Sequence, residues 1–470
     1  MSTSTTPVYD DPNREYGSKV VAVEPGGVEA IPLDERHGRP IGLFWTWVSP
    51  NMEFATVAVG ILSVLYFGLT FWQAVAAIVI GTALGSITQG ILSTWGPREG
   101  LCQMVLSRTA FGYLGNLLPA GINALTAGIG WFAVNSISGA LALHALWSTL
   151  PKELCLVIVV AIQLVVAFFG HNLVHAFERY AFPVLTILFV IAAIVVLTKA
   201  HPSMHAQPGP PTVGGFLITV GAAFGYACGW NPYASDYTRY LAPETRRAPI
   251  ALFAGLGVFL SCVLLEIAGA AVVTAGQSAV DPSSFTNLTP TAIGKLTLLA
   301  VVIGSVAANV LNVYSGAMSF MSIGWKLPLK QARGIVAVAF AVIGFVVASF
   351  GISNAGENYE NFLLIIAYWI APWLGVVLVD RFLRRRTAPN TATLARSYQN
   401  WAGPIAMVVG AVVSIWLFSN QTKYVGPIPS AHPKVGDLTA EVGFVLSAVV
   451  YYVLFLALRP KLGDETPAAA

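Results

Sequence analysis

Two stretches decide the fold of this chain: WTWVSPNMEFATVAVG at residues 45–60 and FGYACGWNPYASDYTRY at residues 224–240. Each places a proline beside an asparagine, Pro50–Asn51 and Asn231–Pro232, in an otherwise apolar helix. Because proline removes a backbone donor and clashes with the preceding turn, both helices are expected to break. Lipid tolerates such a break only where it lines a protein interior or a watery cavity. This predicts an inverted-repeat transporter with its site between the breaks; the alternative is two ordinary proline kinks.

The composition outside these stretches belongs to a membrane protein. Of the 470 residues, 56% are hydrophobic and only 10% are charged, against about 25% charged residues in soluble proteins. Too few polar side chains exist to solvate a surface, which excludes a disordered chain, a nucleic-acid binder and a water-soluble enzyme. The polar first forty residues lack the apolar core of a cleaved signal peptide.

Apolar runs separated by charged residues, prolines and glycines predict an all-α protein with twelve transmembrane helices. The predicted spans are 41–67, 71–93, 112–143, 154–172, 180–199, 212–234, 249–275, 295–325, 334–351, 359–380, 400–418 and 438–458. With both termini in the cytoplasm, 20 of the 25 Lys and Arg residues fall on the cytoplasmic side, as expected for a protein of the plasma or inner membrane. The basic run Arg381–Arg386 is interpreted as a topology anchor in contact with lipid headgroups.

Tryptophan and asparagine mark one face of the third predicted span, GIGWFAVNSISG at residues 128–139. Trp131 and Asn135 are four residues apart and therefore share a helix face. A flat aromatic surface beside an amide that both donates and accepts suits a planar heterocycle with mixed hydrogen-bonding groups. The alternative is helix–helix packing, where such pairs are common.

Two further predicted spans carry the same residue types. Trp230 and Asn231 lie at the second helix break, and Asn309 and Asn312 are three apart in the eighth span. Asparagine is costly in hydrocarbon unless it is paired. Together these residues predict one polar pocket near the membrane midplane.

Acidic residues inside the predicted spans are scarcer still. Glu53 follows the first break, and Glu266 lies in SCVLLEIAGA of the seventh span. A carboxylate buried without a counter-ion can carry a proton. For Glu53, a role in coupling or binding and a structural hydrogen bond to the broken helix both stay open, whereas structural pairing is the preferred interpretation of Glu266.

Motifs of enzymes and metal sites are not found in the sequence. It has no G-x-S-x-G, no H-E-x-x-H and no P-loop, and its four cysteines form no CxxC or His/Cys cluster. We therefore expect no enzyme activity, no metal and no cofactor other than a coupling ion.

The chain resembles the nucleobase:cation symporters of family 1, the permeases for cytosine, purines, uracil, thiamine and allantoin. The resemblance is carried by the first break, by TWGPREGLCQMVLSRTAFGYLG (94–115), GIGWFAVN (128–135), GWNPYASDYTRYLAP (229–243) and AANVLNVYSGAMS (307–319). The third-span pair and the GWNP segment are most similar to the purine–cytosine branch.

This resemblance implies a five-plus-five inverted-repeat fold like that of the leucine transporter, with two helices appended. The implied parts are a cytoplasmic tail at 1–40, repeats at 41–200 and 212–380, the appended spans at 400–458 and a second cytoplasmic tail at 459–470. It also implies that Trp131 and Trp230 stack on the base, that Asn135 and Asn309 contact its edge, and that Ser49 and Asn312 belong to the same site.

Two departures from the family pattern bear on substrate and coupling. Some relatives carry a glutamine where this chain has Gly128, so contacts to the substrate must differ. Sodium-coupled relatives place adjacent hydroxyl residues early in the eighth span, where this chain has Ala307–Ala308. This favours a proton coupled through Glu53, with Glu266 as a second candidate, although Ser305, Asn312 and Ser315 could supply oxygen ligands in a shifted register.

The sequence thus predicts a secondary transporter that imports cytosine or purine bases by symport with a proton. The nearest alternative is the same fold with allantoin, uracil, hydantoin or thiamine as cargo, and a remote one is a channel or a sensor that does not transport. The expected partners are the base, the coupling cation and membrane lipid, with no nucleic acid; the oligomeric state is left open.

Overall fold

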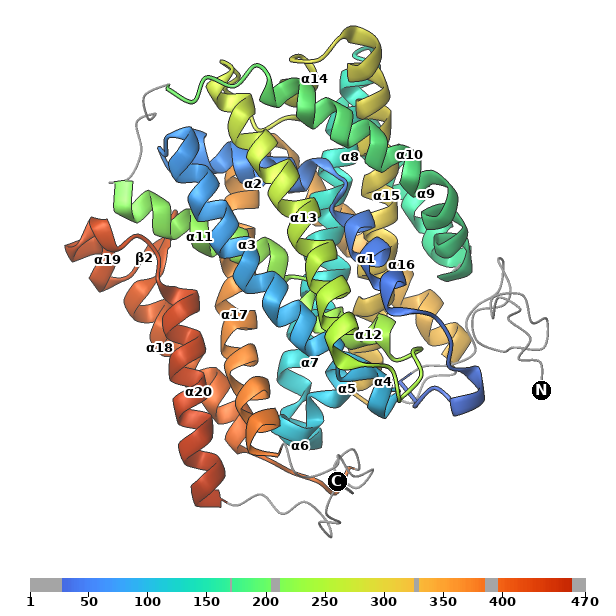
Figure 1. Ribbon diagram of the computed structural model, residues 1–470, viewed down its shortest axis with the longest axis vertical. Coiled ribbons are helices and arrows are strands. Elements are labelled where there is room, and N and C mark those ends of the chain that lie inside the picture. Colours follow the sequence, from blue (N-terminus) through green and yellow to red (C-terminus); the bar gives the residue numbers. More distant parts are fainter. Residues whose placement is uncertain (1–27, 170, 204–211, 325–328, 385–395, 459–470) are drawn as a thin grey trace.

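The computed structural model describes residues 28–169, 171–203, 212–324, 329–384 and 396–458, and these form an almost entirely helical bundle (Figure 1). The predicted tail at 459–470 lies wholly outside the described residues, as does most of the tail at 1–40. The helices are α1 Pro40–Val48, α2 Phe54–Leu65, α3 Phe71–Ser93, α4 Gly96–Glu99, α5 Gln103–Leu106, α6 Arg108–Gly115, α7 Leu117–Leu125, α8 Phe132–Leu146, α9 Lys152–Phe169, α10 His171–Leu197, α11 Thr212–Cys228, α12 Ala234–Thr238, α13 Arg247–Thr274, α14 Pro282–Thr286, α15 Thr291–Ser322, α16 Leu329–Gly351, α17 Ala355–Leu383, α18 Ala402–Phe418, α19 Pro427–Ala431 and α20 Thr439–Leu458. The strands β1 Asn420–Gln421 and β2 Tyr424–Val425 form a small antiparallel hairpin.

Every predicted span coincides with one or more of these helices. Within the described residues, seven helical stretches are long and apolar enough to cross a membrane, and the bent pair α1 and α2 makes up to eight. The seven are Phe71–Glu99, Leu117–Leu146, Thr212–Thr238, Arg247–Thr274, Thr291–Ser322, Val338–Leu383 and Thr439–Leu458. The protein is therefore all-helical and crosses the membrane several times, while the count of twelve stays a prediction.

Both predicted helix breaks are present. The first helix ends at Val48, passes through a tight 3-10 turn at Ser49–Asn51 and resumes at Phe54 with a bend of 63°. The second ends at Cys228, and a 3-10 turn at Asn231–Tyr233 leads into the short α12. Each turn contains the proline that the sequence places there, as the loss of its N–H donor requires.

A third irregularity lies in the helix that the sequence predicts to be regular. Between α7 and α8, residues Thr126–Trp131 form a π-turn, which accommodates an extra residue in one turn. Such turns are frequent at functional sites. Here the π-turn ends on Trp131, one of the two tryptophans predicted to hold the substrate.

The helices around the first break pack without side chains between them. A Cβ at Gly60 of α2 would lie 1.7 Å from the Glu266 carbonyl of α13, and one at Gly269 of α13 would lie 1.9 Å from the Val57 carbonyl. Only glycine permits this approach of two backbones. The segment that follows the first break is thereby held firmly against α13.

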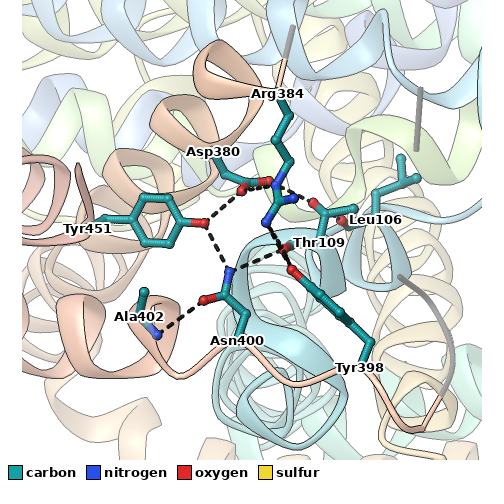
Figure 2. A network of polar contacts seen from close by, with 8 residues as sticks. All are labelled: Leu106, Thr109, Asp380, Arg384, Tyr398, Asn400, Ala402 and Tyr451. Carbon is teal, nitrogen blue, oxygen red and sulfur yellow. Dashed lines mark hydrogen bonds and ion pairs between the residues drawn. The ribbon is translucent and has the colours of Figure 1, made fainter. Parts of the chain in front are cut away.

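A buried polar network ties α18 and α20, at the edge of the bundle, to α17 and α6 (Figures 1 and 2). Asp380 of α17 forms an ion pair with Arg384 and accepts hydrogen bonds from the hydroxyls of Tyr451 (2.7 Å) and Thr109 (3.0 Å). Tyr398, in the segment before α18, accepts from Arg384 (2.9 Å) and donates to the Thr109 carbonyl (2.9 Å). The carboxylate thus joins α17, α20 and α6, and Arg384 and Thr109 extend the network to the segment before α18.

Candidate functional site

The two helix breaks contact each other directly. Trp230, at the second break, donates from Nε1 to Oδ1 of Asn51 in the first break at 2.9 Å. The Asn51 nitrogen donates in turn to the Trp47 carbonyl (2.7 Å) and to Ser261 of α13 (3.1 Å). Asn51 is fully buried, so its amide satisfies backbone freed by the break and fixes the ring of Trp230.

Glu53 lies where the chain leaves the first break and enters α2. Its backbone is extended, and only 2% of the residue is exposed. The Tyr226 hydroxyl of α11 donates to Glu53 Oε1 at 3.3 Å, and the Thr56 hydroxyl lies 2.5 Å from that of Tyr226. Among the described residues Glu53 has no ion-pair partner, so its carboxyl group is held by neutral groups.

Asn135 of α8 contacts this carboxylate, and two asparagines of α15 contact Asn135. The side-chain amide of Asn135 lies 3.0 and 3.2 Å from the two oxygens of Glu53, 2.9 Å from Asn309 Oδ1 and 3.2 Å from Asn312 Nδ2. The hydroxyl of Tyr233, in the second break, lies 3.5 Å from Asn312 Oδ1. We call Glu53, Asn135, Asn309 and Asn312 the amide cluster.

Hydrogen bonds of its side-chain nitrogen fix the orientation of Asn309. Its nitrogen donates to the Phe132 carbonyl at 3.0 Å and lies 3.3 Å from the Ser136 hydroxyl, which donates to Gln163 of α9 at 2.8 Å. If the Asn309 amide turned over, its oxygen would face the Phe132 carbonyl oxygen. Asn309 Oδ1 therefore points at Asn135.

Aromatic rings enclose the same region. The Trp131 ring meets those of Tyr226 and Phe362 edge to face, with centroids 5.5 and 5.1 Å apart. Trp230 packs on Tyr233 at 5.8 Å and on Trp47 at 5.9 Å. Trp131 is 4% exposed and Trp230 6%, so both rings offer apolar surface inside the bundle.

A small pocket of about 50 Å³ lies between α2, α8 and α17. Its lining includes Phe54 and Ala58 of α2, Val134 of α8 and Asn358 and Tyr359 of α17. Glu53 and Asn135 are not among its lining residues, which are mainly apolar.

The structure brings together most of the residues predicted for the site. Asn135 contacts Glu53, Asn309 and Asn312. Trp131 packs on Tyr226, whose hydroxyl donates to Glu53. Ser49 lies buried in the first break but makes no side-chain hydrogen bond to the cluster within the described residues.

Glu266 and Ser315 make no hydrogen bond to the cluster among the described residues. Glu266 accepts a hydrogen bond from Thr82 of α3 at 2.7 Å, which is the structural pairing preferred from the sequence. Ser315 lies in α15, three residues beyond Asn312. Its hydroxyl has no partner among the described residues.

The residue of α15 that faces the first break is Gly304, and not Ala307–Ala308 as expected from the sequence. Gly304 lies there, since a Cβ on it would be 2.8 Å from the Met52 carbonyl and 3.7 Å from the Cβ of Glu53. This is one turn before Ala307–Ala308. Like those alanines, Gly304 offers no hydroxyl, and the neighbouring charged group is the Glu53 carboxylate.

Gly128 has a packing reason in this chain. A Cβ at Gly128 would lie 2.1 Å from the ring of Phe340 in α16. A glutamine at this position would require that ring to move. This chain therefore has the ring of Phe340 packed on the turn where some relatives carry a glutamine side chain.

Sequence reasoning missed several residues that complete the site. Tyr226 precedes Trp230 by four residues, and this spacing could have identified it as a residue on the same helix face. Asn51 was assigned to the break but not to a contact with Trp230. Phe362 carries no signal in the sequence, because its contact with Trp131 joins helices far apart in the chain.

Comparison with known proteins gives one consistent result. Residues 30–443 match the family model described as permease for cytosine/purines, uracil, thiamine, allantoin. The purine-cytosine permease fcyB of Emericella nidulans is 30% identical over 93% of this chain and 88% of its own length. The purine-cytosine permease FCY21 of Saccharomyces cerevisiae is 27% identical over 94% and 87%.

The fold is similar to that of a solved transporter. Mhp1, a nucleobase-cation-symport-1 family transporter in a closed conformation with bromovinylhydantoin bound, superposes with a TM-score of 0.72 at 19% identity, over 94% of this chain and 96% of that one. Its inward-facing conformation gives 0.72 at 20% identity, over 93% and 94%.

Proposed function

This chain belongs to the family of permeases for cytosine, purines, uracil, thiamine and allantoin, and from that premise we propose that it imports cytosine or purine bases together with a proton. Membership makes it a multi-pass membrane transporter and not an enzyme. The base, the proton and the residues that hold them are the proposed part.

The proposed topology has twelve spans in the plasma or inner membrane, with both termini in the cytoplasm. The first five spans, within 41–200, and the second five, within 212–380, form inverted repeats, and the spans in 400–458 are appended. Three observations support it: each predicted span contains a helix, the two breaks lie five spans apart, and 20 of 25 basic residues fall on one side.

One observation carries the proposed binding site: the amide cluster lies between the two helix breaks, next to Trp131. Amides both donate and accept, as the edge of a nucleobase does, and an aromatic face stacks on its ring. We propose that Trp131 and Trp230 hold the ring, while Asn135, Asn309 and Asn312 contact its edge and Ser49 lines the break. The similar proteins fcyB and FCY21 are named purine-cytosine permeases, which favours these bases as cargo.

Glu53 is the proposed proton carrier. It is buried, held only by neutral groups, and lies where Gly304 faces the first break without a hydroxyl. Sodium prefers several oxygen ligands, whereas a proton needs only one carboxylate. Glu266 and Ser315 are secondary candidates, because neither makes a hydrogen bond to the amide cluster among the described residues.

Uptake by the purified protein in proteoliposomes tests this function. With an inward proton gradient, labelled cytosine or adenine should accumulate above its external concentration, and a protonophore should abolish this accumulation. Removing sodium at fixed pH and membrane potential should change nothing. Dependence on sodium would overturn proton coupling, and passive equilibration would indicate a channel.

Competition by unlabelled compounds separates the possible cargoes. Adenine, hypoxanthine and cytosine should compete with labelled cytosine. If only allantoin, uracil, hydantoin or thiamine competed, the fold would be right and the proposed cargo wrong.

A further inference from the structure

Asn135 has neighbours that no single orientation of its amide can satisfy. In one orientation its nitrogen donates to Asn309 Oδ1 at 2.9 Å, but this nitrogen then lies 3.2 Å from Asn312 Nδ2, and the amide oxygen faces both oxygens of Glu53. In the other, the nitrogen donates to Glu53 at 3.0 and 3.2 Å and the oxygen accepts from Asn312, but that oxygen lies 2.9 Å from Asn309 Oδ1.

The surroundings do not relieve this conflict. Asn309 cannot turn, because its nitrogen is held by the Phe132 carbonyl at 3.0 Å. Asn135 itself is 1% exposed, so water does not reach its amide freely. A half-turn about the last side-chain bond exchanges oxygen and nitrogen without a change in shape. Asn135 can therefore turn over inside a packed site.

The proton on Glu53 decides between the two orientations. An ionised carboxylate accepts only, so it requires the nitrogen of Asn135; a protonated one donates, so it can face the oxygen. The titratable groups around Glu53 are Tyr226 on α11, Tyr359 on α17 and Cys262 on α13. All are neutral or acidic, so within the described residues Glu53 has no cation that would hold it ionised.

We propose that Asn135 is a positioning residue that turns over when Glu53 gains or loses its proton, and so converts proton binding into a change in the hydrogen-bonding groups offered to the base. This rests on the proposed function. With Glu53 ionised, Asn135 occupies the donor of Asn312. With Glu53 protonated, Asn135 turns to Asn309 and releases the Asn312 nitrogen, which then donates to a ring nitrogen or carbonyl of the base.

The coupling follows from this exchange. Asn312 is 1% exposed, so its released nitrogen is shielded from water, and leaving such a donor without an acceptor is unfavourable. A base that supplies the acceptor removes this cost only in the protonated state. Proton and base therefore bind more tightly together than apart, which is the reciprocal coupling that a symporter requires.

Equilibrium binding of labelled adenine and cytosine to the full-length protein in nanodiscs, from pH 5 to pH 9, tests the proposal. For the wild type, Kd should rise about tenfold per pH unit above its midpoint, as linkage to one proton requires. Glu53→Gln, whose amide nitrogen can donate to Asn135 as a protonated carboxyl group does, should bind without pH dependence. Asn135→Leu should bind more weakly and lose the slope, with Kd changing less than about threefold over the range.

Asn123→Leu is the matched control. Asn123 is buried in α7, in the same apolar stretch as Asn135, and donates to Ser319 of α15 at 2.7 Å. It makes no hydrogen bond to the amide cluster among the described residues. This variant should keep the slope of the wild type. If Asn135→Leu also kept it, the proposal would be wrong even though the protein still binds base and proton together.

A second variant covers the case in which Asn135→Leu does not fold. Asn312→Leu removes the donor that the turned amide releases, so it too should lose the slope, and an unchanged slope would contradict the proposal. A wild type whose binding is independent of pH would instead overturn proton coupling itself, which separates failure of the proposed function from failure of this inference.

Discussion

At the scale of single residues, the chemistry of the site rests on Glu53 and the aromatic rings around it. Glu53 is a carboxyl group in the bundle interior whose hydrogen-bond partners are neutral, and such a group can exchange a proton during transport. In the proposed function Trp131 adds a face for stacking and no charge. The two residues would then make separable contributions, Glu53 to coupling and Trp131 to affinity.

Replacing Trp131 tests the stacking role. Trp131→Ala should weaken binding of adenine by about 1–3 kcal/mol, or roughly ten- to a hundred-fold in Kd, because stacking of one base on one ring is worth that much. Equilibrium binding in nanodiscs measures it. Trp72→Ala is the control, since Trp72 is 64% exposed on the outside of α3; equal losses in the two variants would contradict a ring–base contact.

Helix periodicity was enough to predict part of the site from the sequence. Trp131 and Asn135 were placed on one face by their spacing, and Asn309 and Asn312 by theirs, and these amides meet in the structure. Their contacts with Tyr226 and Phe362 were not predictable, because periodicity gives the face of a helix and not the helix that it meets. The turning of Asn135 depends on four groups from three elements and could emerge only from their distances.

At the scale of elements, the breaks and the buried network hold the site in place. The breaks were predictable, because proline acts locally on its own helix. The π-turn at Thr126–Trp131 was not predictable, because its sequence contains no proline. The need for glycine at position 128 comes from Phe340, which packs on it from another helix. The network around Asp380 joins α6, α17, α18 and α20 and was likewise invisible to local patterns (Figure 2).

Removing the charge of Asp380 tests the strength of that network. Asp380→Asn leaves the guanidinium of Arg384 buried without its counter-ion, which should cost about 3–5 kcal/mol of stability. Thermal unfolding of the purified protein, followed by size-exclusion chromatography, should show a clearly lower Tm.

Arg381→Gln is the control for this prediction. Arg381 is the neighbour of Asp380, and its pair with Glu99 is longer (3.3 Å) and more exposed. Loss of such a pair costs only about 0–1 kcal/mol. If both variants lowered Tm equally, the buried network would not be a special source of stability.

At the scale of the whole molecule, composition and apolar runs predicted an all-helical membrane protein, and the family match agrees with it. The number of spans is harder to read, since α16 and α17 form one long apolar stretch, Val338–Leu383, by length and hydropathy alone. The contact between Asn51 and Trp230 links the two broken helices. In the proposed function, binding beside this contact would affect both helices, as alternating access between two repeats requires.

In the proposed function, Glu53 carries the proton that drives uptake of the base. Proteoliposomes containing wild-type protein or Glu53→Gln can be assayed in two ways: for accumulation of labelled adenine driven by a proton gradient, and for exchange of labelled for unlabelled adenine without a gradient. Glu53→Gln should exchange adenine but no longer accumulate it, because the binding site is intact and the coupled proton is lost. Gradient-driven accumulation by Glu53→Gln at the wild-type level would show that Glu53 does not carry the coupled proton.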